Sequence, residues 1–88
     1  MQHKMEEHKN GLTLGFRVVY NVEDPKKIPL QPDDIVDVNK FKIAEMINQM
    51  DELRAETDSP DRKRLCSIAI SKLEEDCMFI VKACKYDV

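Results

Sequence analysis

Residues 60–85 read PDRKRLCSIAISKLEEDCMFIVKACK, and this stretch decides the fold. Its apolar residues recur three and four positions apart, which is the spacing of one face of an α-helix. Ser59 and Pro60 mark the start, because serine caps free amides and proline fits the first helical position. We therefore predict a helix from about Pro60 to Lys85. Its stripe comprises Leu65, Ile68, Ala69, Leu73, Cys77, Ile80, Val81 and Cys84, and it is widened by Ile70, Met78 and Phe79.

A second long helix is predicted upstream, from Asp33 to about Glu56. Asp33 follows Pro32 and is the expected N-cap, with Asp34 just inside the first turn. The TDSP break over residues 57–60 is short, so the two helices are expected to form an antiparallel hairpin. The apolar stripe of this helix consists of Val36, Ile43, Met46, Ile47, Met50 and Leu53.

The N-terminal third has a different pattern. Residues 11–20 read GLTLGFRVVY, and these β-branched and aromatic residues predict a short strand or an ordered extended arm. Three prolines lie in residues 21–32 and favour extended chain there. We predict a mainly α fold in one domain, with an N-terminal arm and proline-rich segment over 1–32 and the helical hairpin over 33–88.

Composition limits the classes of partner. A chain of 88 residues buries a modest core, and a two-helix hairpin cannot bury two broad apolar faces alone, so we expect a helical homo-oligomer. The net charge of −3 argues against duplex nucleic acid as a partner. The polar stretch 1–9 is unlike a secretory signal, and no apolar run approaches the ~20 residues that span a bilayer. We therefore expect a soluble, cytoplasmic protein.

Cysteine and histidine positions predict neither catalysis nor a metal or cofactor site. Cys66, Cys77 and Cys84 share one helix face, which is typical of small core residues rather than of zinc ligands in a tight turn. Their odd number favours free thiols in a reducing compartment. His3 and His8 lie in the polar tail and are interpreted as exposed side chains rather than as ligands or a base.

Basic and aromatic residues leave alternatives open. Residues 62–64 place three cations at a helix N-terminus, where they interact unfavourably with the helix dipole. They form either a solvated charged turn or a site where an anion binds at the helix start. Lys42 is likewise either a surface charge or an anion contact. Phe16 and Tyr20 either pack the arm or stack on a base.

Two segments resemble a known family. Residues 64–83 read RLCSIAISKLEEDCMFIVKA, similar to the C-terminal helix RxxSLALTKLEEAxMWxxxA of small phage proteins. Residues 30–42 read LQPDDIVDVNKFK and resemble that family's L(T/S)xxEIxxxNxIK. The family is the phage anti-CBASS sponge, which sequesters the cyclic oligonucleotide signals of bacterial immunity. A related hairpin occurs in phage anti-Thoeris sponges. The resemblance covers roughly Leu30 to Ala83.

The resemblance implies a homohexamer of helical hairpins in the cytoplasm of the infected host, without catalysis and with ligands bound between protomers. It implies that Lys42 contacts the phosphate of a cyclic dinucleotide and that Arg64 serves a separate pocket for cyclic trinucleotides. Asn39 matches the asparagine of the family motif and is carried over as a ligand-binding residue.

The chain departs from the family at two positions. An ungapped alignment places Lys27 where the family has a base-stacking aromatic residue, and the nearest match to its GYR context contains Phe16. The stacking residue is therefore Phe16, Tyr20 or absent. Ala44 replaces a hydroxyl residue that assists the trinucleotide pocket, which favours dinucleotides. Two other hypotheses remain: a helical module that docks a host protein and, with least support, a small phosphodiesterase.

Overall fold

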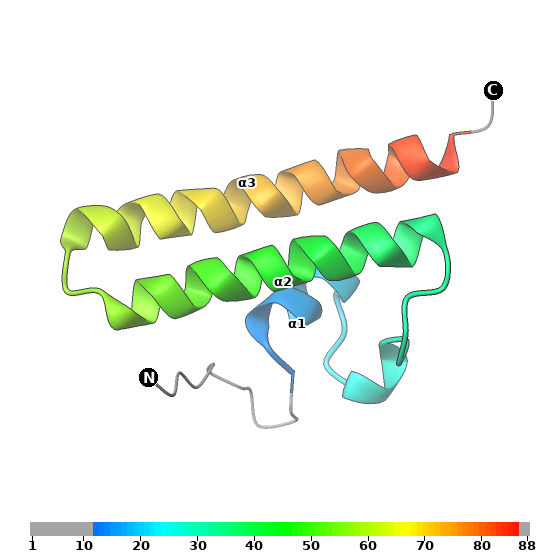
Figure 1. The fold of residues 1–88 in the computed structure, drawn as a ribbon, viewed down its shortest axis with the longest axis horizontal. Helices are drawn as coiled ribbons and strands as arrows, with labels where there is room; N and C mark the ends of the chain where they lie inside the picture. The colour runs from blue at the N-terminus through cyan, green and yellow to red at the C-terminus, as the bar shows by residue number, and fades with distance from the viewer. Residues whose placement is uncertain (1–11, 87–88) are drawn as a thin grey trace.

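The computed structural model describes residues 12–86, which form a helical hairpin with a short helix packed on one side (Figure 1). The predicted exposed histidines, His3 and His8, lie outside this range. Helices α2 (Ile35–Glu56) and α3 (Pro60–Lys85) run antiparallel, side by side. The described elements before the hairpin are α1 (Leu14–Tyr20) and a 3-10 turn, η1 (Pro25–Lys27).

The predicted limits of α3 are confirmed. Ser59 is extended at the N-cap, and its hydroxyl accepts a hydrogen bond from the Arg62 N–H at 3.2 Å. Pro60 occupies the first helical position, where its missing N–H leaves no intrahelical bond unmade. The local signals at residues 59 and 60 were therefore sufficient to place this helix start.

Helix α2 begins one residue later than predicted. Asp34, not Asp33, is the N-cap: its backbone is extended (φ −135°, ψ 171°) and its carboxylate accepts from the Asp37 N–H at 2.8 Å. Two adjacent aspartates offer the same capping chemistry, so the sequence did not distinguish them. The end of α2 at Glu56 matches the prediction.

The prediction of a strand or extended arm over 11–20 is wrong, because Leu14–Tyr20 is helical. Leu14 and Val18 are four residues apart and both pack against the core of the hairpin. Burial of this face outweighs the weak strand preference of β-branched residues. Asn21 ends the helix in the left-handed conformation (φ 53°, ψ 47°), which asparagine tolerates better than most residues.

The proline-rich segment 21–32 is irregular apart from η1. Asp24 caps this turn by accepting from the Lys26 N–H at 3.0 Å. The expectation of extended chain is therefore wrong over Pro25–Lys27, where proline fits the first position of a turn.

The core lies where α1 covers the α2–α3 hairpin. Its buried centre is Ile43, Ile47, Ile70 and Cys77, and Leu14, Val18, Val19, Met50, Leu73, Ile80 and Val81 pack around it. Five residues of the predicted stripes are exposed instead of packed in this core. They are Met46 (49% exposed), Leu65 (56%), Ile68 (43%), Met78 (62%) and Phe79 (62%). Helix α3 therefore buries one face and leaves a second apolar face in solvent. Within residues 12–86, no helix combines the length and apolar character needed to cross a bilayer.

Candidate functional site

Three aromatic rings cluster where α1 meets α2. Phe16 and Tyr20 lie parallel with ring centroids 6.4 Å apart, and Phe41 meets them edge-on at 5.0 and 6.1 Å. Lys40 Nζ lies 4.5 Å from the centroid of the Tyr20 ring, within cation–π range. The Tyr20 hydroxyl donates to Asp37 Oδ1 at 3.1 Å. Tyr20 is thus held on several sides by α2 and has a structural role.

The environment of Tyr20 disfavours its ionised form. Burial raises the pKa of this phenol well above its ordinary value, and the hydrogen bond to Asp37 raises it further. Tyr20 therefore stays neutral, and a donor to Asp37, throughout the ordinary pH range.

A groove of about 760 Å³ runs beside this cluster, between α2 and the chain from α1 to the proline-rich segment. We call it the α1–α2 groove. Its lining is mainly apolar and includes two half-buried aromatic side chains, Phe16 and Phe41. Among the described residues, its lining holds two glutamates and no lysine or arginine. It is lined by Leu12, Thr13, Phe16, Pro25, Ile28, Pro29, Leu30, Phe41, Glu45, Asn48, Gln49 and Glu52.

Two predicted ligand-binding cations adjoin this groove along the chain. Lys42 directly follows the lining residue Phe41, and Lys27 directly precedes the lining residue Ile28. Both lysines are exposed. The fold therefore brings Phe16, Lys42 and Lys27 into the neighbourhood of one groove, although they come from three different elements.

The other two predicted residues lie elsewhere. Asn39 Nδ2 donates to the Ile35 carbonyl at 2.8 Å and lies 3.7 Å from Cys84 Sγ, so its amide joins α2 to α3. Arg64 is exposed near the start of α3, with its guanidinium 4.0 Å from the Asp61 carboxylate. Neither residue lines the α1–α2 groove, and their assignment to ligand binding stays a prediction.

The structure also identifies a residue that sequence reasoning missed, Asn48. It is only 6% exposed, its Oδ1 accepts from the Gly15 N–H at 2.7 Å, and its Nδ2 donates to Thr13 Oγ1 at 2.9 Å. The Gly15 amide belongs to the first turn of α1, where it has no acceptor within the helix. Asn48 therefore supplies from α2 the cap that Thr13 does not provide.

Gly15 is required by close packing rather than by a phosphate. A Cβ atom at this position would collide with the carbonyl oxygen of Ala44 and lie 2.8 Å from Asn48 Oδ1. Ala44 is itself fully buried. Contact between these small residues lets the backbone of α1 lie directly on α2, which fixes one wall of the groove.

A second groove, of about 540 Å³, lies between α1 and α3 and contains both signs of charge. Its lining includes Lys40 and Lys82 together with Glu74 and Glu75, above the buried Cys77. Burial raises the pKa of the Cys77 thiol, which disfavours the reactive thiolate. This groove therefore offers no activated nucleophile.

The described residues contain one cluster with metal-ligand spacing, formed by Asp33, Asp34 and Asp37. Asp34 caps α2 and Asp37 accepts from Tyr20, so these two carboxylates already have structural partners. The three cysteines are free thiols, with Cys66 and Cys77 buried in the packed face of α3. Comparisons of the chain with protein-family models, with curated proteins and with solved structures find no match.

Proposed function

We propose that this chain is a phage anti-defence protein that binds cyclic dinucleotides, holds them without cleavage and thereby blocks CBASS immunity in the cytoplasm of the infected host. The observation that carries the proposal is the α1–α2 groove, whose lining contains Phe16 and Phe41 and is adjoined along the chain by the exposed lysines Lys42 and Lys27. The resemblance of residues 30–83 to the sponge family supports the same conclusion.

The groove supplies the two kinds of contact that a cyclic dinucleotide needs. The faces of Phe16 and Phe41 offer stacking surfaces for a base, which is worth about 1–3 kcal/mol per base. Lys42 and Lys27 offer cations for the phosphates at the rim. Glu45 in the lining repels phosphate, so we place the bases within the groove and the phosphates outside it.

We place the ligand between two chains. Two facing chains contribute four such lysines, two for each phosphate of a cyclic dinucleotide, together with four lining glutamates, and they enclose the bases from both sides. This agrees with the proposed homohexamer, in which ligand lies between protomers. Sequestration then requires burial of the ligand and no chemical step.

Arg64 belongs to a separate site in this proposal. The 14 residues from Lys42 to Glu56 extend about 21 Å along α2, and Arg64 lies beyond the hairpin turn that follows. One small ligand cannot contact both residues on one chain. Ala44 is fully buried beneath Gly15 and cannot touch ligand in this fold, so the proposal rests on dinucleotides, with trinucleotides as a secondary class.

Calorimetry with cyclic dinucleotides tests the proposal. Lys42→Ala removes one charge-assisted phosphate contact worth about 1.5–3 kcal/mol, so the dissociation constant should rise roughly 10- to 150-fold. Lys63→Ala is the matched control, because Lys63 is an exposed lysine at the far end of the hairpin. Ligand recovered intact after denaturation of the complex would support sequestration over hydrolysis.

Three results would contradict the proposal: no binding of any cyclic dinucleotide, equal loss in both variants, or cleaved ligand. Absence of binding would favour the alternative, a helical module that docks a host protein. The observation behind that alternative is the second apolar face of α3, which includes the exposed Met78 and Phe79.

A further inference from the structure

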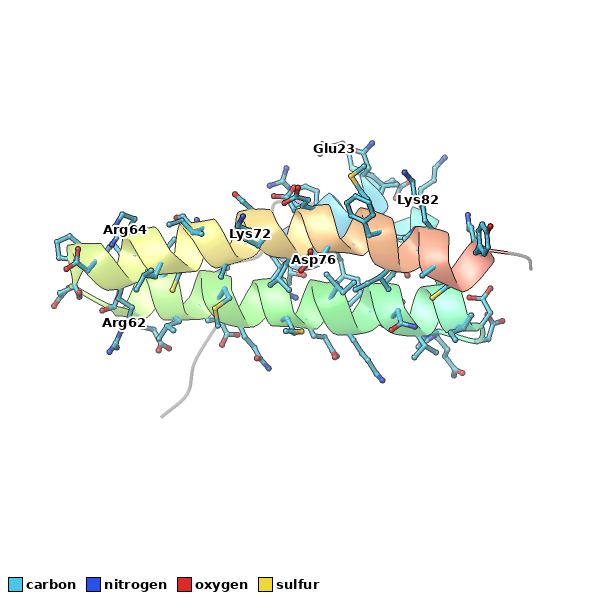
Figure 2. The ribbon with its side chains drawn as sticks, turned by 90° about the horizontal axis from the view of Figure 1, so that it is seen from above. Glu23, Arg62, Arg64, Lys72, Asp76 and Lys82 are labelled. Atoms are coloured by element: carbon cyan, nitrogen blue, oxygen red, sulfur yellow. The ribbon has the colours of Figure 1, made fainter. Side chains whose placement is uncertain are left out.

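The outer face of α3 carries large apolar side chains that the rest of the described chain leaves exposed. Leu65 is 56% exposed, Ile68 is 43% exposed and Phe79 is 62% exposed, although α3 has already buried its opposite face against α2. Figure 2 looks down on α3 and shows charged residues, including Arg64, Lys72 and Lys82, distributed along the same helix. Apolar and charged residues thus alternate along an exposed helix.

Six residues of this face follow a heptad spacing of three and four. The period of 3.5 residues is that of a seam between two helices packed as a coiled coil. The stripe runs for five turns with a charged pair at its middle. We call it the outer α3 stripe; it consists of Leu65, Ile68, Lys72, Glu75, Phe79 and Lys82.

We propose that the outer α3 stripe pairs with the same stripe of a second copy of this chain, antiparallel and about a two-fold axis between Leu73 and Glu74. In that register, Lys72 of each copy faces Glu75 of the other, which makes two symmetric ion pairs at the centre. Ile68 of each copy packs on Phe79 of the other, on either side of the centre. Such self-complementarity is what an interface with two-fold symmetry requires.

The other registers bring like charges together or place charged side chains against both large apolar residues near the centre. Parallel pairing places Lys72 against Lys72 and Glu75 against Glu75 of the second copy. If one antiparallel copy is shifted by seven residues in one direction, Lys72 of one copy faces Lys82 of the other. If it is shifted by seven residues in the opposite direction, Ile68 faces Lys72 of the other copy and Leu65 faces its Glu75. Of the registers compared, only the proposed one pairs Lys72 with Glu75 and Ile68 with Phe79. At its two ends Leu65 of one copy faces Lys82 of the other, where the lysine's alkyl chain can cover the leucine while its ammonium group stays in solvent.

This inference deepens the self-association contained in the proposed function, but it is independent of any ligand. The stripe is on α3, whereas the α1–α2 groove is formed by α2 and the chain that precedes it. Failure of nucleotide binding would leave the inference standing. Conversely, nucleotide binding by a monomer would overturn the inference and leave the binding function intact.

Analytical ultracentrifugation of charge-reversal variants, without ligand, tests the pairing. We expect the wild-type protein to sediment as a dimer or a multiple of two. Lys72→Glu and Glu75→Lys should each weaken association at least tenfold, because each places like charges at the centre twice. The double variant, Lys72→Glu with Glu75→Lys, should restore it. Lys63→Glu, which reverses an exposed charge outside the stripe, should leave association unchanged.

Circular dichroism of each variant separates loss of association from loss of helix. The register has its own check: Ile68→Cys chains mixed with Phe79→Cys chains should form mixed disulfide dimers under mild oxidation, above the background from the native cysteines. A monomeric wild type, no rescue by the double variant, or equally efficient cross-linking within one variant would overturn the proposal.

Discussion

The contact that attaches α1 to the hairpin can be tested at a single residue, Asn48. Replacement by alanine removes the acceptor of the Gly15 N–H and the donor to Thr13 Oγ1. A buried amide left without a partner costs about 1–3 kcal/mol, and the second hydrogen bond is worth about 0.5–1.5 kcal/mol. We therefore expect Asn48→Ala to lower the free energy of unfolding by about 2–4 kcal/mol, a large share of the about 5–15 kcal/mol typical of small domains.

Urea denaturation followed by circular dichroism measures this loss, and hydrogen exchange shows where it acts. Because Asn48 caps α1, the Gly15 amide should lose most of its protection against hydrogen exchange. Amides in the middle of α3 should lose only the protection that corresponds to the drop in the free energy of global unfolding. Gln49→Ala is the matched control, since Gln49 is an exposed amide on the same helix. Asn48→Asp keeps an acceptor for the Gly15 N–H, so its loss of unfolding free energy should lie between those of Asn48→Ala and Gln49→Ala.

The reasoning would be refuted if Asn48→Ala and Gln49→Ala differed by less than about 0.5 kcal/mol, the scatter of ordinary surface substitutions. It would also fail if the Gly15 amide kept its protection in Asn48→Ala. Either result would mean that α1 is held by apolar packing alone and that the two hydrogen bonds add nothing to its stability.

Two further predictions concern the same contact region. Gly15→Ala should destabilise the protein by about 1–3 kcal/mol or more, measured by urea denaturation, because its Cβ collides with the Ala44 carbonyl; a neutral result would mean that α1 can move away at no cost. The raised pKa of Tyr20 means that its stabilising effect is complete below the unfolded value of about 10 and is lost as pH rises further. Thermal melts of Tyr20→Phe should therefore depend less on pH above about 10 than those of the wild type, and an identical pH dependence would exclude Tyr20 as the cause.

Sequence was most informative where the determining contacts are local. The start of α3 depends on Ser59 and Pro60 alone, and its end at Lys85 also agrees with the prediction. Helix α1 depends on a contact over 33 residues, between Gly15 and Asn48, and no local pattern contains that information. A residual signal did exist: Phe41, Ala44 and Asn48 recur three and four apart, which marks a second face of α2 that needed a partner.

The candidate site likewise combines residues that local sequence identifies with residues that only tertiary packing brings together. Lys42 and Phe16 were named from sequence, but Phe41 and the glutamates of the lining became relevant only when α1 was placed against α2. The pairing of aromatic side chains on one wall with charges on the rim depends on tertiary packing. The spacing along the chain could not predict it.

Oligomer size links the two proposals. A two-fold interface joins two chains and then closes, so pairing through the outer α3 stripe can produce a dimer but not, by itself, a hexamer. A hexamer requires a second contact surface, and the α1–α2 groove has one exposed apolar residue suited to it, Leu30, which is 98% exposed. If the ligand lies at that second surface, charge reversal at Lys72 should convert hexamers to trimers that still bind nucleotide. If the wild type is instead a dimer that this substitution converts to monomers, the stripe is the sole interface and the groove binds its ligand within one chain.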